Sequence, residues 1–187
     1  MRAGKIHKAF KAKNSRRIIL RDLRWEDLDD CVRFINRLVE ERNVQSDLGI
    51  IADKKQSREE ESEWLASLLI GVEKGDILSV AAEAGGRIVA NSQVTRGRYG
   101  DTKHHGSLGI SVLKNYRGLG IGYEMMRTLM RESRRAGLKS LQLEVFANNA
   151  RAIHVYEKAG FRQVGKIPKK IHRDSRFFDI ILMSAQV

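Results

Sequence analysis

Three glycines at alternate positions constrain this chain most, because they join a strand-like segment to a helix-like one. They lie in NYRGLGIG, residues 115–122, between SLGISVL and a strongly helical stretch. The first N–H groups of a helix have no partner within the helix, and the helix dipole attracts anions to that end. Because glycine lacks a Cβ, a phosphate can approach such a backbone closely. The segment therefore predicts a site for a phosphate-bearing ligand.

Two common phosphate-binding motifs do not fit these glycines. G-x-G-x-x-G would require glycine at position 123, where Tyr123 stands, and G-x-x-x-x-G-K-S/T occurs nowhere in the chain. The dinucleotide-binding and P-loop interpretations are therefore rejected. Taken alone, the glycines could also serve only the geometry of a connecting turn.

Strand and helix signals alternate along the chain and predict an α/β (α+β) fold. Branched residues indicate a strand over residues 16–23, and apolar residues at helical spacing follow over residues 24–43. Ser57 and Glu60 form the S-x-x-E capping box of a second helix, which ends near Gly75. The later elements are a hairpin around Gly85 and Gly86, a strand over residues 107–113, a helix over residues 121–137, a strand over residues 139–146, a helix over residues 149–160, and strands over residues 161–171 and 176–184. We expect one mixed sheet of about seven strands with four helices.

The charge distribution separates the first residues from the rest of the chain. The net charge is +12, and residues 1–17 carry seven basic residues and no acidic one. We interpret residues 1–15 as a basic, flexible N-terminal arm and residues 16–187 as a single domain. A nucleic-acid-binding or ribosome-associated arm is the alternative, because a basic arm neutralises phosphates without needing a fold.

Composition constrains the cellular location of the protein and its partners. No segment approaches the roughly eighteen apolar residues that a membrane helix needs, and no apolar segment follows the basic N-terminus as in a secretory signal. The single cysteine, Cys31, permits no internal disulfide, which favours a reducing compartment. No Cys/His constellation indicates zinc. We expect a cytoplasmic protein with no membrane partner and no metal.

Two motifs, taken together, resemble the GNAT superfamily of N-acetyltransferases. SVLKNYRGLGIGYEMM is similar to the family's acetyl-CoA motif, Q/R-x-x-G-x-G/A after a strand, which Arg117, Gly120 and Gly122 satisfy. LEVFANNARAIHVYEKAGF is similar to the family's next segment, through Asn149, Ala152, Tyr156, Gly160 and Phe161. The close resemblance covers residues 107–161, and the order of elements matches the family over residues 16–185.

The resemblance implies acetyl-CoA as co-substrate and a primary amine as acceptor, which is a small molecule, a polyamine or a protein N-terminus. It implies that the backbone of residues 110–112 pairs with the pantetheine arm and that the amides of residues 118–123 hold the pyrophosphate. Asn149 and Tyr156 would face the thioester, and their spacing of about two helical turns places them on one helix face. The implied cofactor-binding residues are Ile110, Val112, Arg117, Gly118, Leu119, Gly120, Ile121, Gly122, Tyr123, Asn149 and Tyr156.

Catalysis requires a proton acceptor, because an amine with a pKa near 10 is mostly protonated at neutral pH. Glu144, at the end of a strand, resembles the glutamate base of the family's ribosomal-protein alanine acetyltransferases. Glu83 beside the hairpin turn and a water relay are the alternatives. Tyr156 would protonate the departing thiolate. Cys31 lies on the apolar side of the first helix, so we expect direct transfer without a covalent acetyl-enzyme.

The sequence leaves the acceptor and the assembly open. Residues 43–56 occupy the region where family members build the acceptor pocket, and they contain no recognisable substrate signature. A late basic run either lines that pocket, where it would disfavour a polycation, or lies on a solvated hairpin. Its members are Lys166, Lys169, Lys170, Arg173 and Arg176. A homodimer and a non-catalytic acyl-CoA-binding module are further alternatives.

Overall fold

The computed structural model describes residues 4–44 and 52–187. Its strands are β1 (Ile6–Lys11), β2 (Arg17–Arg21), β3 (Ile77–Ala84), β4 (Arg87–Arg96), β5 (His105–Val112), β6 (Ser140–Phe146), β7 (Arg162–Arg173) and β8 (Arg176–Gln186). Its α-helices are α1 (Leu28–Val44), α2 (Arg58–Lys74), α3 (Ile121–Arg135) and α4 (Ala150–Lys158). Short 3₁₀ turns are formed by Trp25–Asp27, Gly100–Thr102 and Lys114–Tyr116.

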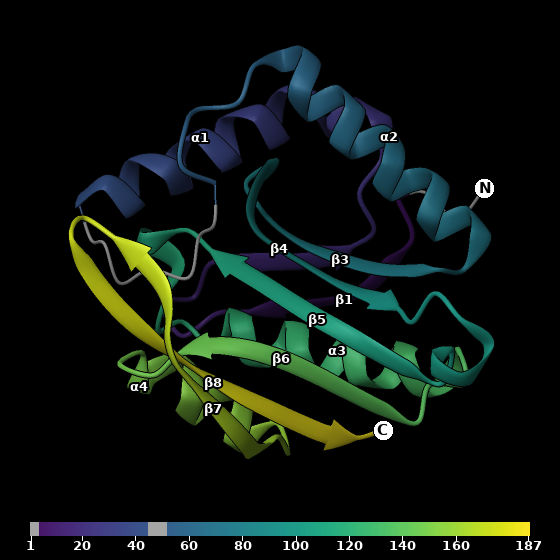
Figure 1. Cartoon of the computed structure of the whole chain (residues 1–187). Coiled ribbons are helices and arrows are strands. Elements are labelled where there is room, and N and C mark those ends of the chain that lie inside the picture. The colour runs from purple at the N-terminus through teal and green to yellow at the C-terminus, as the bar shows by residue number, and fades with distance from the viewer. Residues whose placement is uncertain (1–3, 45–51) are drawn as a thin grey trace.

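The strands form one open, mixed sheet in the order β1-β2-β3-β4-β5-β6-β8-β7. Neighbouring strands are antiparallel, except for the parallel pair β5 and β6. Helices α1 and α2 lie on one side of the sheet and α3 and α4 on the other (Figure 1). The predicted mixed α/β fold with four helices is confirmed for the described residues, and the sheet has eight strands there rather than about seven.

Local signals placed the ends of the elements correctly. The side chain of Ser57 accepts a hydrogen bond from the amide of Glu60 at 3.2 Å, and Glu60 accepts one from the amide of Ser57 at 2.8 Å. The predicted capping box at the start of α2 is thus confirmed, and the helix ends at Gly75. Gly85 and Gly86 have φ angles of +57° and +75°, the positive values that a tight two-residue hairpin requires.

The sheet is packed on both sides by apolar clusters. On one side, Met125 and Leu129 of α3 are fully buried against the sheet. On the other side, Phe34 of α1 and Leu65 of α2 are buried with Cys31, which is 3% exposed. Burying a side chain of this size contributes about 1.5–3 kcal/mol. The prediction that Cys31 belongs to the core is therefore confirmed.

The predicted flexible arm is wrong for residues 6–11, which form β1 and pair antiparallel with β2. Two of its basic residues are paired with acids from distant parts of the chain. Lys5 lies 3.2 Å from Glu132, and Lys8 lies 2.5 Å from Glu124, both on α3. The run of basic residues suggested a solvated tail because the acidic partners of Lys5 and Lys8 lie more than a hundred residues away in the sequence. Residues 1–3 of the predicted arm lie outside the described residues.

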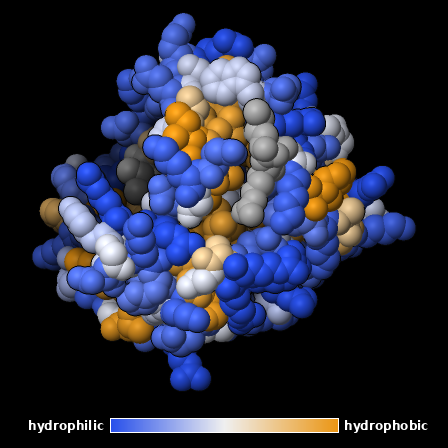
Figure 2. Space-filling view, turned by 90° about the vertical axis from the view of Figure 1, so that its right-hand side faces the viewer, coloured by the Kyte–Doolittle hydropathy of each residue, from blue (hydrophilic) through white to orange (hydrophobic). Residues whose placement is uncertain are grey.

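Figure 2 shows a mostly hydrophilic face with a small hydrophobic area near its centre. This surface is consistent with a chain in which 31% of the residues are charged. In the part of the chain that the structure describes, no helix is both long enough and apolar enough to span a membrane.

Candidate active site

A cleft of about 1730 Å³ begins where the two parallel strands separate. The pairing of β5 with β6 covers only residues 105–107 and 140–142. Beyond these pairs both strands continue along the cleft without pairing to each other, so their facing backbone groups are open to a ligand. An extended ligand can insert there as an additional strand.

The glycine loop borders one end of this cleft. Gly118 and Gly120 have φ angles of +77° and +86°, and a Cβ built on either would meet nothing within 4 Å. Helix α3 begins immediately after Gly120, and its first backbone bond joins the amide of Glu124 to the carbonyl of Gly120 at 3.2 Å. No described side chain caps this end. The amides of residues 121–123 are thus left for an anion.

Lys11 at the end of β1 and Lys13 in the β1–β2 connection also line this end of the cleft. The amide of Lys13 donates to the carbonyl of Leu119 at 3.3 Å, which fixes the connection beside the glycine loop. Lys11 and Lys13 are exposed and lie along the cleft. Sequence analysis missed them because it assigned this segment to a flexible arm.

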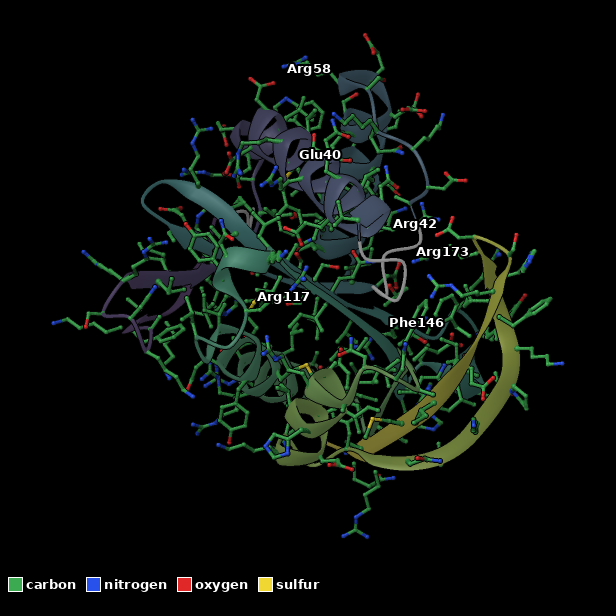
Figure 3. The ribbon with its side chains drawn as sticks, turned by 90° about the vertical axis from the view of Figure 1, so that its left-hand side faces the viewer. Glu40, Arg42, Arg58, Arg117, Phe146 and Arg173 are labelled. Atoms are coloured by element: carbon green, nitrogen blue, oxygen red, sulfur yellow. The ribbon has the colours of Figure 1, made fainter. Side chains whose placement is uncertain are left out.

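Arg117 is held by protein contacts. Its Nε donates to the carbonyl of Val112 at 2.8 Å, and its guanidinium forms an ion pair with Glu41 of α1. Glu41 also accepts a hydrogen bond from the amide of Lys114 at 2.9 Å. Figure 3 shows Arg117 beneath α1, at the end of β5. This member of the acetyl-CoA motif therefore ties the glycine loop to β5 and α1.

The two predicted α4 residues both line the cleft. Oδ1 of Asn149 accepts a hydrogen bond from the amide of Ala152 at 3.1 Å, so Asn149 is the N-cap of α4. Tyr156 is 9% exposed, and burial raises the pKa of its phenol to about 12. The hydroxyl is protonated at neutral pH and can donate a proton or a hydrogen bond into the cleft.

Of the two predicted base candidates, only Glu144 is a cleft residue. Both of its carboxylate oxygens lie 2.5 Å from Nζ of Lys170 on the β7–β8 hairpin. Glu83 instead accepts a hydrogen bond from the buried Arg21 at 2.7 Å, outside the residues that line the cleft. Arg21 also forms a bidentate pair with Asp27, so this cluster stabilises the fold.

Helices α1 and α2 supply the opposite wall of the cleft. Phe34, Leu38 and Trp64 form its apolar part. Glu61 is only 6% exposed, and burial raises the pKa of its carboxyl to about 7. Sequence analysis missed Glu61. Its position three residues before Trp64, on the same face of α2, was the available signal.

The late basic run lies mainly in contacts on the hairpin. Lys166 pairs with Asp179 at 2.7 Å, and the guanidinium of Arg173 lies 5.5 Å from the ring centroid of Phe146. The hairpin rises toward the C-terminal end of α1, where Arg42 lies (Figures 1 and 3). None of the five basic residues is among those lining the cleft.

The acetyltransferase (GNAT) family model matches residues 35–161. The chain belongs to the GNAT acetyltransferase family. This family uses acetyl-CoA, so the chain is an acetyl-CoA-dependent acyltransferase, as the two sequence motifs predicted. Among the residues that the structure describes, no group of three or more His, Cys, Asp or Glu could hold a metal ion.

Three relatives illustrate the range of similar GNAT proteins. YwnH of Bacillus subtilis (strain 168), provisionally named a phosphinothricin acetyltransferase, is 24% identical over 170 residues, which are 90% of this chain and 98% of YwnH. The structure of the ribosomal-protein-alanine N-acetyltransferase from Brucella melitensis matches with a TM-score of 0.77 and 24% identity, over 90% of this chain and 99% of that one. The structure of yncA from Salmonella typhimurium with acetyl-CoA matches with a TM-score of 0.74 and 16% identity, over 90% and 93%.

Proposed function

We propose that this GNAT protein transfers the acetyl group of acetyl-CoA directly to a primary amine. The acceptor classes considered are small amines, polyamines and protein N-termini. The observation that carries the proposal is that one cleft contains the glycine loop, the buried phenol of Tyr156 and a carboxylate that can accept a proton.

Features at several places along the cleft support the proposed binding of acetyl-CoA. The open space at Gly118 and Gly120, with the free helix amides beyond them, suits the diphosphate. Lys11 and Lys13 add positive charge at the same end. The separated strands β5 and β6 leave backbone groups for the amides of the pantetheine arm, with Ile110 and Val112 of β5 along the opening. Leu119, Ile121, Gly122 and Tyr123 complete the proposed cofactor-binding set.

The proposed reaction needs two proton transfers. The amine nitrogen bonds to the thioester carbonyl carbon, and the bond from that carbon to sulfur breaks. Glu144 accepts the proton that the amine loses, and Tyr156 donates one to the departing thiolate, whose ordinary pKa is near 8.5. Asn149 borders the same end of the cleft and positions the start of α4. Acetyl-CoA supplies the activated acyl group.

A covalent acetyl-enzyme is not part of the proposal, because the one cysteine is unsuited to attack. Cys31 is 3% exposed in the core, and burial, followed by the nearby Glu61, raises the pKa of its thiol to about 12. The thiolate is the nucleophilic form, and this pKa suppresses it. The buried, unpaired thiol also underlies our proposal of a cytoplasmic location.

A turnover screen tests the proposed function. Acetyl-CoA is incubated with the protein and with amino acids, polyamines or N-terminal peptides, and the released thiol is measured. We expect release that depends on at least one amine. Binding of acetyl-CoA without turnover on any amine would instead indicate a non-catalytic acyl-CoA-binding module.

The base assignment is tested with Glu144→Gln. We expect kcat to fall at least about a hundredfold, with a flattened acidic limb of the pH profile. Lys170→Met is the matched control, because it removes the ion-pair partner but retains the carboxylate. A Glu144→Gln protein with near-normal kcat and an intact acidic limb would shift the base role to a water relay.

A further inference from the structure

Glu61 is a buried carboxyl for which the protein provides no counter-charge. Its residue is 6% exposed, and it lines the cleft. Within residues 4–44 and 52–187, its side chain has no ion pair and no hydrogen bond, and desolvation alone explains its altered acidity. Burying an unpaired carboxylate costs several kcal/mol, so such a group usually has a ligand or a function.

A second unsatisfied acceptor belongs to another residue that lines the cleft. Oδ1 of Asn91 is buried and has no hydrogen-bond partner, and Asn91 lines the cleft from β4. Asn91 pairs in register with Ala81 of β3, which belongs to the apolar cluster under α1 and α2, so its side chain shares the face that α1 and α2 cover. The side-chain oxygens of Glu61 and Asn91 have no described hydrogen-bond donor as partner, so a ligand group rich in N–H donors would complement both.

The wall around Glu61 favours a cation. The cleft residues from α1, α2 and β4 include Glu60 and Glu61 and, in the described part of the chain, no Lys, Arg or His. Phe34 and Trp64 offer aromatic faces, which attract ammonium groups. An acceptor with a carboxylate would bring like charge toward Glu61, whereas an ammonium would gain a charge-assisted hydrogen bond.

Glu61 is remote from the reacting end of the cleft. Helix α2 contacts β3 and α1 contacts β4, whereas Glu144 is on β6 and Tyr156 on α4 (Figure 1). Strand β5 lies between β4 and β6, and β6 is no longer paired with β5 at Glu144, so β4 and β6 are more than two strand spacings, or about 10 Å, apart there. One nitrogen cannot contact Glu61 and also lie at Glu144, so the cation at Glu61 is a second one.

We infer that Glu61, assisted by Asn91, binds a second positively charged nitrogen of the acceptor, and that the acceptor is an aliphatic diamine or polyamine without a carboxylate. This inference rests on the proposed amine acetylation and specifies its substrate class. Glu61 acts as a specificity-determining residue that holds one end of the acceptor while the other end reaches the thioester.

The test compares matched acceptors in wild-type protein and in Glu61→Gln. Thiol release is measured with butylamine, putrescine and spermidine, and with methionine as an amino acid. For wild type we expect kcat/KM for spermidine to exceed that for butylamine by about a hundredfold or more. Glu61→Gln should raise KM for spermidine at least about tenfold, with kcat within about threefold and butylamine unaffected. Glu63→Gln, an exposed residue of the same helix, is the control.

Several results would overturn the inference. A wild-type preference for methionine or butylamine over spermidine excludes a second ammonium site, even if Glu61→Gln fails to fold. An equal loss of kcat with all amines would make Glu61 a proton acceptor instead. If no amine is turned over, the proposed function fails, and thermal stabilisation by spermidine still tests the binding site. We expect such stabilisation in wild type and in Glu63→Gln but not in Glu61→Gln.

Discussion

At the scale of single residues, the phenol of Tyr156 combines burial in the cleft wall with a pKa near 12. A thiolate leaving group can depart partly unaided, so its protonation assists the reaction rather than enabling it. We expect Tyr156→Phe to lower kcat about tenfold to a thousandfold, which is about 1.4–4 kcal/mol of barrier. Binding of acetyl-CoA, measured by calorimetry, should be mostly retained. An unchanged kcat would remove Tyr156 from the proposed mechanism.

Glu61 should make stability depend on pH. Its pKa is about 7 in the folded protein and near the ordinary 4.5 in the unfolded chain. Between these values the folded state holds the proton more tightly, so the contribution of Glu61 to the free energy of unfolding falls by roughly 3 kcal/mol as pH rises from 4.5 to 7. Glu61→Gln cannot ionise and should therefore be more stable than wild type at pH 8 but not at pH 4. Urea unfolding at both pH values measures this.

The control for that experiment is Glu63→Gln on the exposed side of α2, which should track wild type at both pH values. If the difference between wild type and Glu61→Gln were the same at pH 4 and pH 8, the carboxyl would not be desolvated in solution. The pH dependence of stability thus reports whether Glu61 is buried in the wall of the cleft.

At the scale of elements, we propose that the glycine loop and the start of α3 form one anion site. Gly120 has a φ angle of +86°, and open space surrounds its missing Cβ. We expect Gly120→Asp to abolish thermal stabilisation by acetyl-CoA, because the new carboxylate occupies the diphosphate position and repels it. Gly120→Asn, which tolerates positive φ and carries no charge, is the matched control and should retain more of the effect. Undiminished stabilisation of a folded Gly120→Asp protein would contradict the proposed phosphate site.

Elements defined by local signals were predictable from the sequence, and elements defined by distant partners were not. The capping box of Ser57 and the hairpin glycines act within a few residues, so pattern alone located α2 and the β3–β4 turn. Strand β1 was missed because Lys8 and the preceding Lys5 are paired with acids on α3. The ion pair between Lys170 and Glu144 joins residues 26 positions apart, which no local pattern indicates.

The wall of the cleft that α1 and α2 form could not be predicted either, because it also depends on contacts between distant residues. Glu61 reads in the sequence as one of several acids at the start of a helix, where acids suit the helix dipole. Only the packing of α2 against α1 buries it beside the cleft. The family motifs singled out the glycine loop, Asn149 and Tyr156, and all of them line the cleft.

At the scale of the whole molecule, the cleft is electrically polarised. Its basic lining residues come from the end of β1, the β1–β2 connection, residues 114–117 and α4, whereas α2 contributes Glu60 and Glu61. A net charge of +12 adds to the attraction of a polyanionic co-substrate. Basic residues thus line the end of the cleft where we propose that the phosphates bind, and acidic residues line the wall where we propose that the amine binds.

This polarisation predicts the salt dependence of co-substrate binding. Lys11 and Lys13 are exposed, and salt weakens the interactions of exposed charges. The Debye length is about 8–10 Å near physiological ionic strength. We expect KM for acetyl-CoA to rise with added salt in wild type, and to rise less steeply in a protein carrying both Lys11→Ala and Lys13→Ala. Lys139→Ala, an exposed lysine outside the cleft, should keep the wild-type slope. If KM for acetyl-CoA depended equally on salt in the double variant and in wild type, the phosphates would lie away from Lys11 and Lys13. Removing a charge contact with the phosphates must weaken the dependence of binding on salt.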